Sequence, residues 1–561
     1  MIGGDAMNVS GGYTKASSAA ASANSSDNTV TLGGGVAVSA NVNGGYADIS
    51  SATGASTAYA RRNAVTIGDG TYADNIYGGL VDTGSNTSAI VEVTNNTVTL
   101  TGAPSFAGST ELWGGFNLAT ATPAFSNLFR NNRLIIENPI SSPVATIGNF
   151  QNMELMITAN SPAIQTTALT LGGNSNTTTI DRIDVTSGSA PLTAGQTVTV
   201  IGASGTVTNP TLIDPTSIGQ QGAATNYTYD DIKYDSAAPT GAGVTARVAT
   251  ATLNPTTAAL GTSNLSQLSL YGQASNLMIQ QLLPFVSDIM PDSGAQAFFV
   301  TDWGKSRYDT GSHSDVEGYT MMAGAAMNQK TAFGSLALSA FVEYGSGDYN
   351  SSGTYSGVHA KSGGDSSFTG VGVLGRFAWS NNFYTDASIH TGKSKSDFSS
   401  NDLAFGQRAS YDIKGNYVGA HVGVGYIMPI NPQMKLDMSA RYLWNRIDGD
   451  SATILGDRFR FDDITSERLR VGGRLSYAVD NRFTPYVGLY YDHEFDGRAT
   501  GDVYGFKLKG VKVTGGTTNA EVGFTYKPQF KNDALMINLG LLGYTGKREG
   551  YSGVLKASWA F

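Results

Sequence analysis

The sequence predicts an all-β protein: a right-handed parallel β-helix, then a 12-stranded antiparallel transmembrane β-barrel with a helix in its lumen. Three observations predict this fold class. Residues 1–165 repeat every 33 to 36 residues in strand-forming and turn-forming residues. Residues 291–561 divide into twelve runs of alternating apolar and polar residues, and an uncharged helical pattern stands between the two parts.

The overall composition limits the class of protein. The chain has 561 residues, too many for a single core, so we expect at least two domains. It contains no cysteine, which excludes disulfides and thiolate chemistry. Charged residues make up 14% of the chain, against roughly 25% in ordinary soluble domains. No run of 18 apolar residues occurs, so a membrane-spanning part would have to be a β-barrel.

The charge is distributed unevenly along the chain. Residues 1–290 hold 8 Lys and Arg against 17 Asp and Glu, whereas residues 291–561 hold 27 of each. The acidic first part argues against a nucleic-acid partner, which would need clustered basic residues. The first residues, MIGGDAMNVSGG, lack the basic and apolar regions of a signal peptide. Because Met1–Gly4 looks like a clipped repeat, we expect an N-terminally incomplete chain.

Residues 1–165 contain two interleaved motifs. Asn8–Tyr13 (NVSGGY) recurs at 41–46, 75–80 and 111–116, and Asn28–Leu32 (NTVTL) recurs at 63–67, 96–100 and 132–136. Units of Val, Thr, Asn and Gly form strands and turns, so this period predicts a β-helix rather than a helical solenoid. We expect the asparagines to stack in ladders at the turns. One long coil or two short ones would fit each unit.

The next two segments are predicted to close the β-helix and to form a helix. Residues 166–261 contain strand patterns without the repeat motifs, and a solenoid end needs a cap, so we interpret them as a cap and linker. Residues 262–290 carry apolar residues at helical spacing from Thr262 to Leu283, with Ser263 as the expected cap and Pro284 as the expected end. The helix is uncharged up to that point, so we expect it to be enclosed. Its polar residues facing the lumen wall would be Asn264, Gln267, Asn276 and Gln280.

Residues 291–561 are predicted to form the barrel. Short connections alternate with longer polar ones at 347–365, 395–413, 448–463 and 496–515, as short turns and long loops do in bacterial barrels. The twelve expected strands lie near 295–304, 316–328, 332–346, 366–379, 382–394, 414–428, 433–447, 464–479, 482–495, 516–528, 533–544 and 549–561.

The charged residues of these runs fall on one face of each strand. A charged side chain facing lipid at mid-membrane would cost roughly 2–4 kcal/mol, so these charges are expected to face the lumen. Opposite signs could neutralise one another there: Glu343, Asp437 and Glu521 against Arg376, Arg441, Arg470 and Arg474.

The last run is the clearest strand. Its odd positions are apolar or aromatic, whereas its even positions are mostly small or polar. A soluble protein rarely exposes such an edge, but a barrel can pair it with its first strand and cover its apolar face with lipid. The residues of this face are Tyr551, Gly553, Leu555, Trp559 and Phe561.

The order of these parts resembles the classical monomeric autotransporters of type V secretion. A β-helix passenger, a cap, an uncharged helix, a twelve-stranded barrel and a terminal Phe561 follow one another, and Pro191–Ser204 (PLTAGQTVTVIGAS) resembles the end of the autochaperone region. The resemblance implies a translocator barrel in the outer membrane, in contact with its lipid, and a passenger at the cell surface. It also implies that the barrel-assembly machinery recognises the strand Tyr551–Phe561.

The candidate chemistry of the passenger is sparse. Residues 1–290 contain no histidine or cysteine, so Ser-His-Asp, Cys-His and His-based metal sites are excluded there. Asp181 and Asp184 are expected to be surface charges, and Asp230-Asp231 a solvated loop rather than a calcium site. Some autotransporters cut their linker helix at asparagine; Asn264 and Asn276 are candidates, with hydrogen bonding to the lumen wall preferred. No cofactor or metal is expected.

Two function hypotheses follow, with a third held behind them. The first is display of the passenger for adhesion or aggregation, with ligands on host or neighbouring cells. The second is a secretion carrier for an N-terminal enzyme or toxin domain missing from this chain. A passive diffusion porin would require the helix 262–283 to lie outside the barrel.

Overall fold

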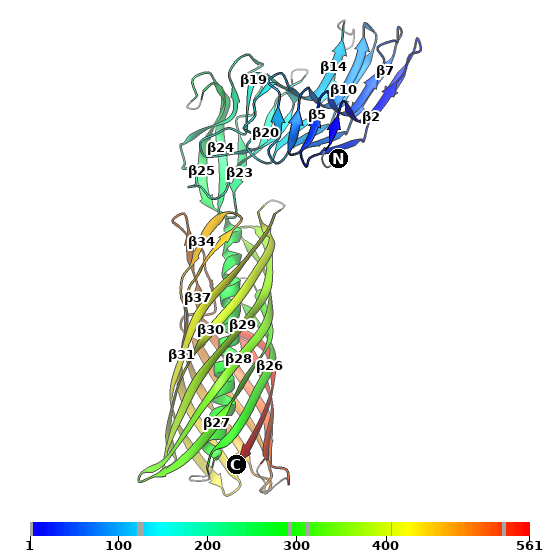
Figure 1. Cartoon of the computed structure of the whole chain (residues 1–561). Coiled ribbons are helices and arrows are strands. Elements are labelled where there is room, and N and C mark those ends of the chain that lie inside the picture. The colour runs from blue at the N-terminus through cyan, green and yellow to red at the C-terminus, as the bar shows by residue number, and fades with distance from the viewer. Residues whose placement is uncertain are drawn as a thin grey trace. The chain divides into compact units, whose positions relative to one another are not determined.

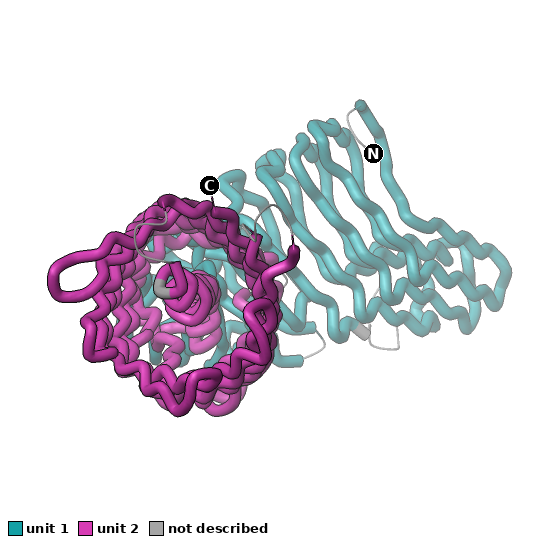
Figure 2. Tube along the Cα trace, turned by 90° about the horizontal axis from the view of Figure 1, so that it is seen from below, with its two compact units in different colours: residues 1–252 teal, residues 253–561 magenta. Residues whose placement is uncertain are grey.

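The computed structural model describes residues 4–120, 128–173, 176–238, 241–289, 294–309, 313–404, 407–529 and 535–560. The chain forms two compact units that meet between Thr252 and Leu253 (Figures 1 and 2). Strands dominate both units, and the helical residues all lie at the start of the second. Among the described residues, no helix is both long and apolar enough to cross a membrane. The predicted all-β fold class is confirmed.

The first unit is a parallel β-helix in which one repeat forms one coil. Each of the first four coils contributes one strand to each of four stacks of parallel strands. Equivalent residues of successive coils stand in register, such as Val9, Val42 and Ile76. Two stacks are formed by short strands: β1 (Asp5–Ala6), β5 (Val36–Val38), β9 (Gly70–Tyr72) and β13 (Ser105–Phe106), then β3 (Ser22–Asn24), β7 (Thr57–Arg61), β11 (Ile90–Thr94) and β15 (Leu128–Arg130).

The other two stacks continue through later, shorter coils. One contains β2 (Val9–Lys15), β6 (Val42–Asp48), β10 (Ile76–Gly84), β14 (Glu111–Ala119), β17 (Val144–Phe150) and β19 (Ile164–Leu171). The other contains β4 (Thr29–Leu32), β8 (Ala64–Ile67), β12 (Thr97–Leu100), β16 (Arg133–Ile136), β18 (Asn152–Ile157) and β20 (Thr179–Val185). Alternate residues point inward, and Val65, Val98 and Leu134 stack in a continuous buried core.

A ladder of buried asparagines runs along one turn of the coils. Asn28 Nδ2 donates to Asn63 Oδ1 at 2.9 Å, Asn63 to Asn96 at 3.0 Å and Asn96 to Asn132 at 3.1 Å. The backbone N–H of Asn132 ends the ladder on Gln151 Oε1 at 2.9 Å. The side-chain oxygen of each asparagine also accepts the backbone N–H of the preceding one, so buried polar groups of successive coils satisfy one another.

The antiparallel end of the β-helix begins later than the sequence suggested. Although β19 and β20 lie in the predicted cap, they still pair in parallel with β17 and β18. Antiparallel pairing starts with β21 (Thr197–Ala203), which pairs with β25 (Gly243–Leu253), and with the hairpin of β23 (Ser217–Gln221) and β24 (Thr225–Asp235); the short β22 (Val207–Thr208) pairs with β19. The repeat motifs can no longer be recognised beyond residue 165, but the parallel coils continue past it.

The second unit is a closed antiparallel barrel of twelve strands, as predicted (Figure 2). The last strand pairs with the first, so that Ala297 stands opposite Trp559. In order, the strands are β26 (Gln296–Asp309), β27 (His313–Thr331), β28 (Gly334–Tyr355), β29 (Val358–Trp379), β30 (Phe383–Ala404), β31 (Gln407–Asn431), β32 (Met434–Ile447), β35 (Ile464–Tyr477), β36 (Phe483–Glu494), β41 (Gly515–Tyr526), β42 (Leu535–Gly546) and β43 (Arg548–Ala560).

Two of the predicted long loops are strands instead. Residues 347–365 and 395–413 mostly extend β28 to β31 into tall hairpins, with Ser356 and Gly357 as a tight turn at positive φ. These extensions are rich in Ser, Gly and Asp on both faces, so they lack the apolar alternation that marks the membrane part. We call this end of the barrel the long-hairpin end and the opposite one the short-turn end.

The two other long connections are folded as well. Residues 448–463 and 496–515 contribute a small antiparallel sheet of β33 (Ser451–Ile454), β34 (Asp457–Phe461), β38 (Gly501–Val503) and β39 (Phe506–Lys507). A second pair joins β37 (Arg498–Ala499) to β40 (Val511–Lys512). We call these two connections the collar, because Ala499 and Val511 pack against Gly261 at the start of the lumen helix.

Candidate functional site: the plugged lumen

A continuous helical segment fills the lumen from Pro255 to Asp288 (Figure 2). It consists of the 3-10 turns η1 (Pro255–Gly261), α1 (Thr262–Leu277), the π-helical η2 (Met278–Leu282) and α2 (Leu283–Asp288). All residues of α1 except Gly272 are buried. Residues 255–287 of this segment carry no charge, so placing them in the lumen has no cost of transferring a charge out of water.

The ends of this segment differ from the sequence prediction. Asn254, not Ser263, caps the start: its side-chain oxygen accepts the N–H of Thr256 at 3.2 Å, and its Nδ2 donates to the carbonyl of Leu403 at 2.7 Å. Pro284 does not end the helix. The N–H of Leu283 donates to the carbonyl of Met278, five residues back, and this π turn accommodates a proline without an N–H.

An aromatic clamp holds the helix at the long-hairpin end. Tyr411 stacks between Phe398 and Phe461, with ring centroids at 4.8 and 5.3 Å. Its hydroxyl lies 2.8 Å from the hydroxyl of Ser263 and donates to the carbonyl of Leu260. Because Phe461 belongs to the collar, the same stack joins the collar, a barrel strand and the helix.

The predicted lumen charges all lie in the interior, and the structure gives each its own partner. Glu521 accepts two hydrogen bonds from Arg474, at 2.6 and 3.0 Å. Asp437 lies 3.8 Å from Arg376, whose guanidinium covers the ring of Tyr384 at 3.3 Å. Both pairs lie within the set of opposite charges that the strand pattern assigned to the lumen, although the sequence did not say which residues would pair.

Three of the predicted charges instead pair with groups that sequence reasoning missed. Glu343 contacts His390 Nδ1 at 2.8 Å. Arg441 donates to Asp386 at 3.1 and 3.2 Å, and Arg470 donates to Asp492 at 2.5 and 2.6 Å. The signal was present in the sequence, because all three partners stand at polar positions of alternating strands: Asp386 and His390 share one face of β30, and Asp492 lies opposite the apolar face of β36. The register between neighbouring strands determines which charged residues form pairs, and the sequence does not reveal that register.

Polar contacts also join the lumen helix to the wall below the clamp. Asn276 Oδ1 accepts from Arg470 at 3.1 Å, the carbonyl of Gln280 accepts from Arg474, and Gln273 donates to Asp302 at 2.6 Å. The side-chain nitrogens of Gln267 and Gln280 are buried and find no acceptor among the described residues. Asn264 is buried near the clamp. Wall and helix therefore fit together closely and are hydrogen-bonded at further points, such as Ser266 with Ser366 at 2.9 Å and Ser269 with Tyr308 at 3.0 Å.

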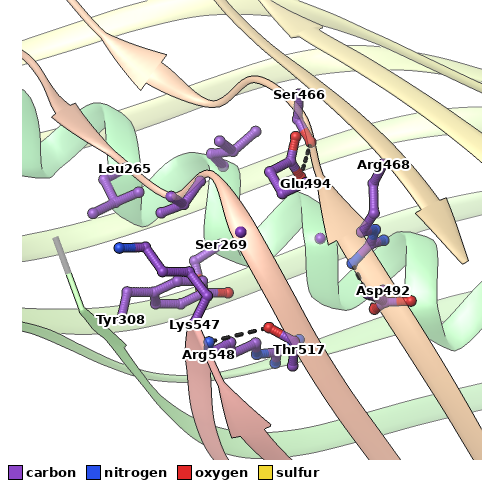
Figure 3. A pocket seen from close by; sticks show the side chains of 14 residues that line it. Leu265, Ser269, Tyr308, Ser466, Arg468, Asp492, Glu494, Thr517, Lys547 and Arg548 are labelled. Carbon is purple, nitrogen blue, oxygen red and sulfur yellow. Dashed lines mark hydrogen bonds and ion pairs between the residues drawn. The ribbon is translucent and has the colours of Figure 1, made fainter.

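A small polar pocket lies between the helix and the wall (Figure 3). It has a volume of about 60 Å³ and opens beside Gly272, where an added Cβ would meet no atom within 4 Å. Arg468 faces it from the wall and contacts Asp492 at 3.6 Å, while Glu494 accepts the hydroxyl of Ser466 at 2.7 Å. The pocket has room for about two water molecules, and its lining gives them polar partners.

The outer face of the barrel is apolar, in contrast to the lumen. On β43, Tyr551 and Leu555 are exposed outward, while Ser552, Val554 and Lys556 are buried inward. Gly553 shares the outward face and Trp559 stands on the same face beside Ala297, whereas Phe561 lies outside the described residues. A belt of exposed Val, Leu, Ile and aromatic side chains encircles the barrel: among them Val342, Val371, Ile389, Val422, Leu489, Val522 and Leu541.

Comparisons with known proteins agree with this architecture. A family model described as the autotransporter beta-domain matches residues 295–539. No curated protein matches the chain. Similar solved structures include the BrkA beta domain of Bordetella (16% identity, 48% of this chain, 99% of that chain, TM-score 0.38). Others are the NalP translocator domain of Neisseria meningitidis (15%, 53%, 100%, 0.39) and the AIDA-I transport unit of Escherichia coli (15%, 52%, 98%, 0.39). Residues 295–539, which form most of the barrel, therefore match the autotransporter beta-domain.

Proposed function

We propose that the barrel anchors this chain in an outer membrane and carries the β-helix to the cell surface. The observation that supports this most directly is the uncharged segment from Pro255 to Val286 inside a closed, outwardly apolar barrel. This segment connects the long-hairpin end, where Pro255 lies, to the short-turn end, where β26 begins. The β-helix is attached at the long-hairpin end, so translocation through the barrel would leave it outside.

The displayed β-helix is proposed to act by binding, in adhesion or aggregation. Its repeated coils present the same kinds of side chain at a regular spacing, which suits binding to a repetitive partner such as another cell surface. The rings of Tyr13 and Tyr46 on adjacent coils are in tilted contact, with centroids 5.0 Å apart, and the hydroxyl of Tyr13 donates to Asp48 at 3.0 Å. This ordered pair of rings and acids is one example of such a surface.

Cysteine labelling can test the proposed topology, because the chain has no cysteine of its own. Three exposed positions serve as single reporters: Ser85→Cys in the β-helix, Thr453→Cys in the collar and Asn481→Cys in a short turn. A membrane-impermeant maleimide should label the first two in intact cells and Asn481→Cys only after permeabilisation. Protection of Ser85→Cys in intact cells would refute display, and heat-modifiable gel mobility verifies that each barrel is folded.

A further inference from the structure

A groove on the outer face of the barrel carries three lysines. It has a volume of about 490 Å³ and is lined, among others, by Tyr344, Thr369, Lys393, Lys395, Lys414 and Asn416. Strand register arranges them in two rows. Tyr344 stands opposite Thr369, which stands opposite Lys393, and Lys395 stands directly opposite Lys414 one step further toward the long-hairpin end.

The lining of the groove contains three lysines and no carboxylate. Acids stand at its edge: Asp450 accepts the backbone N–H of Lys414 at 2.9 Å, and Asp448 accepts from Asn416 at 3.2 Å. Two like charges directly opposite each other on neighbouring strands destabilise the pair, as Lys395 and Lys414 do here. Lys395 has an acid partner, Asp412, at 3.3 Å. Within the described residues, neither Lys393 nor Lys414 forms a side-chain ion pair. A bound anion would relieve this repulsion.

The groove lies at the edge of the apolar belt. On β30 the outward residues pass from Ile389, which is 55% exposed, through Thr391 to Lys393. On β31 they pass from Val422, 60% exposed, to Lys414. Tyr344 marks the same boundary on β28, where aromatic side chains of membrane proteins meet the lipid headgroups.

We propose that this groove binds the phosphorylated headgroup of a membrane lipid whose acyl chains cover the apolar belt. The inference rests on the proposed insertion of the barrel in a membrane. Ammonium groups bind phosphate as point charges, and the adjoining apolar strands give the acyl chains a surface that a free ion would not use. Toward the long-hairpin end, Asp397 faces Asp412 and Asp348 faces Asp365. These acids confine an anionic headgroup to the lysine rows.

Native mass spectrometry of the full chain, refolded in a neutral detergent, can count retained lipid molecules. The probe is a lipid with a phosphomonoester headgroup, and the variant is Lys393→Gln/Lys395→Gln/Lys414→Gln. The matched control, Lys507→Gln/Lys509→Gln/Lys512→Gln, removes three exposed lysines from the collar at the same end. We expect the groove variant to weaken lipid retention by on the order of tenfold or more, and the control to retain wild-type binding.

Three outcomes would overturn the inference. Equal loss in the groove variant and the control would mean that net charge alone attracts the lipid, and equal retention in wild type and groove variant would remove the site. Inorganic phosphate distinguishes the source: displacement of the lipid by phosphate at a concentration equal to that of the lipid would show a phosphate site rather than a lipid site. If the cysteine-labelling experiment failed but the detergent-refolded protein still bound the lipid through the groove, the result would count against the proposed function and not against the lipid site.

Discussion

The guanidinium of Arg470 donates a hydrogen bond of 3.1 Å to the side-chain oxygen of Asn276, and so joins the barrel wall to the middle of the lumen helix. Asn276→Ala removes this bond from a buried charged donor, a loss of roughly 1.5–3 kcal/mol in helix retention. Planar-bilayer recordings should therefore show open-pore events about tenfold more often, or more.

The control for this prediction is Asn264→Ala. Asn264 is also buried on the helix, but the described residues give its side chain no hydrogen bond to a wall charge. We expect its pore activity to stay close to wild type. Equal opening in both variants would show that general loosening of the helix, rather than the bond to Arg470, sets the closed state.

The ion pair of Arg474 and Glu521 predicts an asymmetric mutational pattern. Each single change, Arg474→Met or Glu521→Gln, leaves a buried group without its partner and should cost roughly 3–5 kcal/mol of barrel stability. The double variant Arg474→Met/Glu521→Leu removes both charges and should recover most of that loss. Urea titration with heat-modifiable gel mobility measures all three, and an additive double variant would disprove the coupling.

Asp48 predicts that the β-helix loses stability in acid. Its burial opposes ionisation, but hydrogen bonds from Ser50, Lys15 and Tyr13 outweigh this and lower the pKa of Asp48 to about 2. Because the pKa of Asp48 is lower in the folded state than in the unfolded state, its contribution to the free energy of unfolding is complete above about pH 5. This contribution is lost as the pH falls toward 2. Asp48→Asn should remove roughly 2 kcal/mol at pH 7 and abolish this acid dependence.

Asp184 supplies the opposite case in the same β-helix. Burial raises the pKa of Asp184, and Arg182 only partly offsets this. Its contribution to stability should therefore grow as the pH falls through its raised pKa. Hydrogen–deuterium exchange of residues 4–252 at pH 7, 4.5 and 3 compares Asp184→Asn with Asp48→Asn. Identical pH profiles for the two variants would contradict both assignments.

The last strand predicts an assembly defect. Deletion of Phe561 removes the residue that follows β43, the strand that closes the barrel against β26, and should lower the amount of folded barrel in the outer membrane several-fold. The β-helix variant Tyr13→Ala serves as the control, with barrel levels unchanged. Normal levels of the deletion variant would show that the terminal residue is dispensable for assembly.

The sequence predicted the strand face on which a charged residue lies better than it predicted the ion-pair partner of that residue. Two-residue alternation placed Arg441 and Arg470 in the lumen, because lipid rejects charge whatever the neighbours are. Their partners Asp386 and Asp492 depended on register between strands, which is set by the shear of the closed barrel and by no local pattern. The tall hairpins were missed for a related reason: without lipid on one face, a strand needs no apolar alternation.

The helix shows the same division. Its lack of charge predicted enclosure, whereas its contacts with Tyr411 and Asn276 came only from the structure. Pro284 suggested an end by a local rule that the π turn at Met278–Leu282 overrides. In the β-helix the motifs predicted repetition, and parallel pairing then decided that each repeat makes one coil.

The asparagine ladder makes the β-helix extendable in whole repeats. The segments Asn28–Leu32 and Asn96–Leu100 are identical, and the two inner asparagines, Asn63 and Asn96, each donate to one neighbour and accept from the other. A duplicated coil would find the same hydrogen-bond partners on both sides, and removal of one coil would bring two matching neighbours together. Recombination between the similar DNA stretches that encode the repeats would produce either change. Each event would change the length of the β-helix by about 4.8 Å, the spacing of neighbouring strands, without redesigning either its core or its cap.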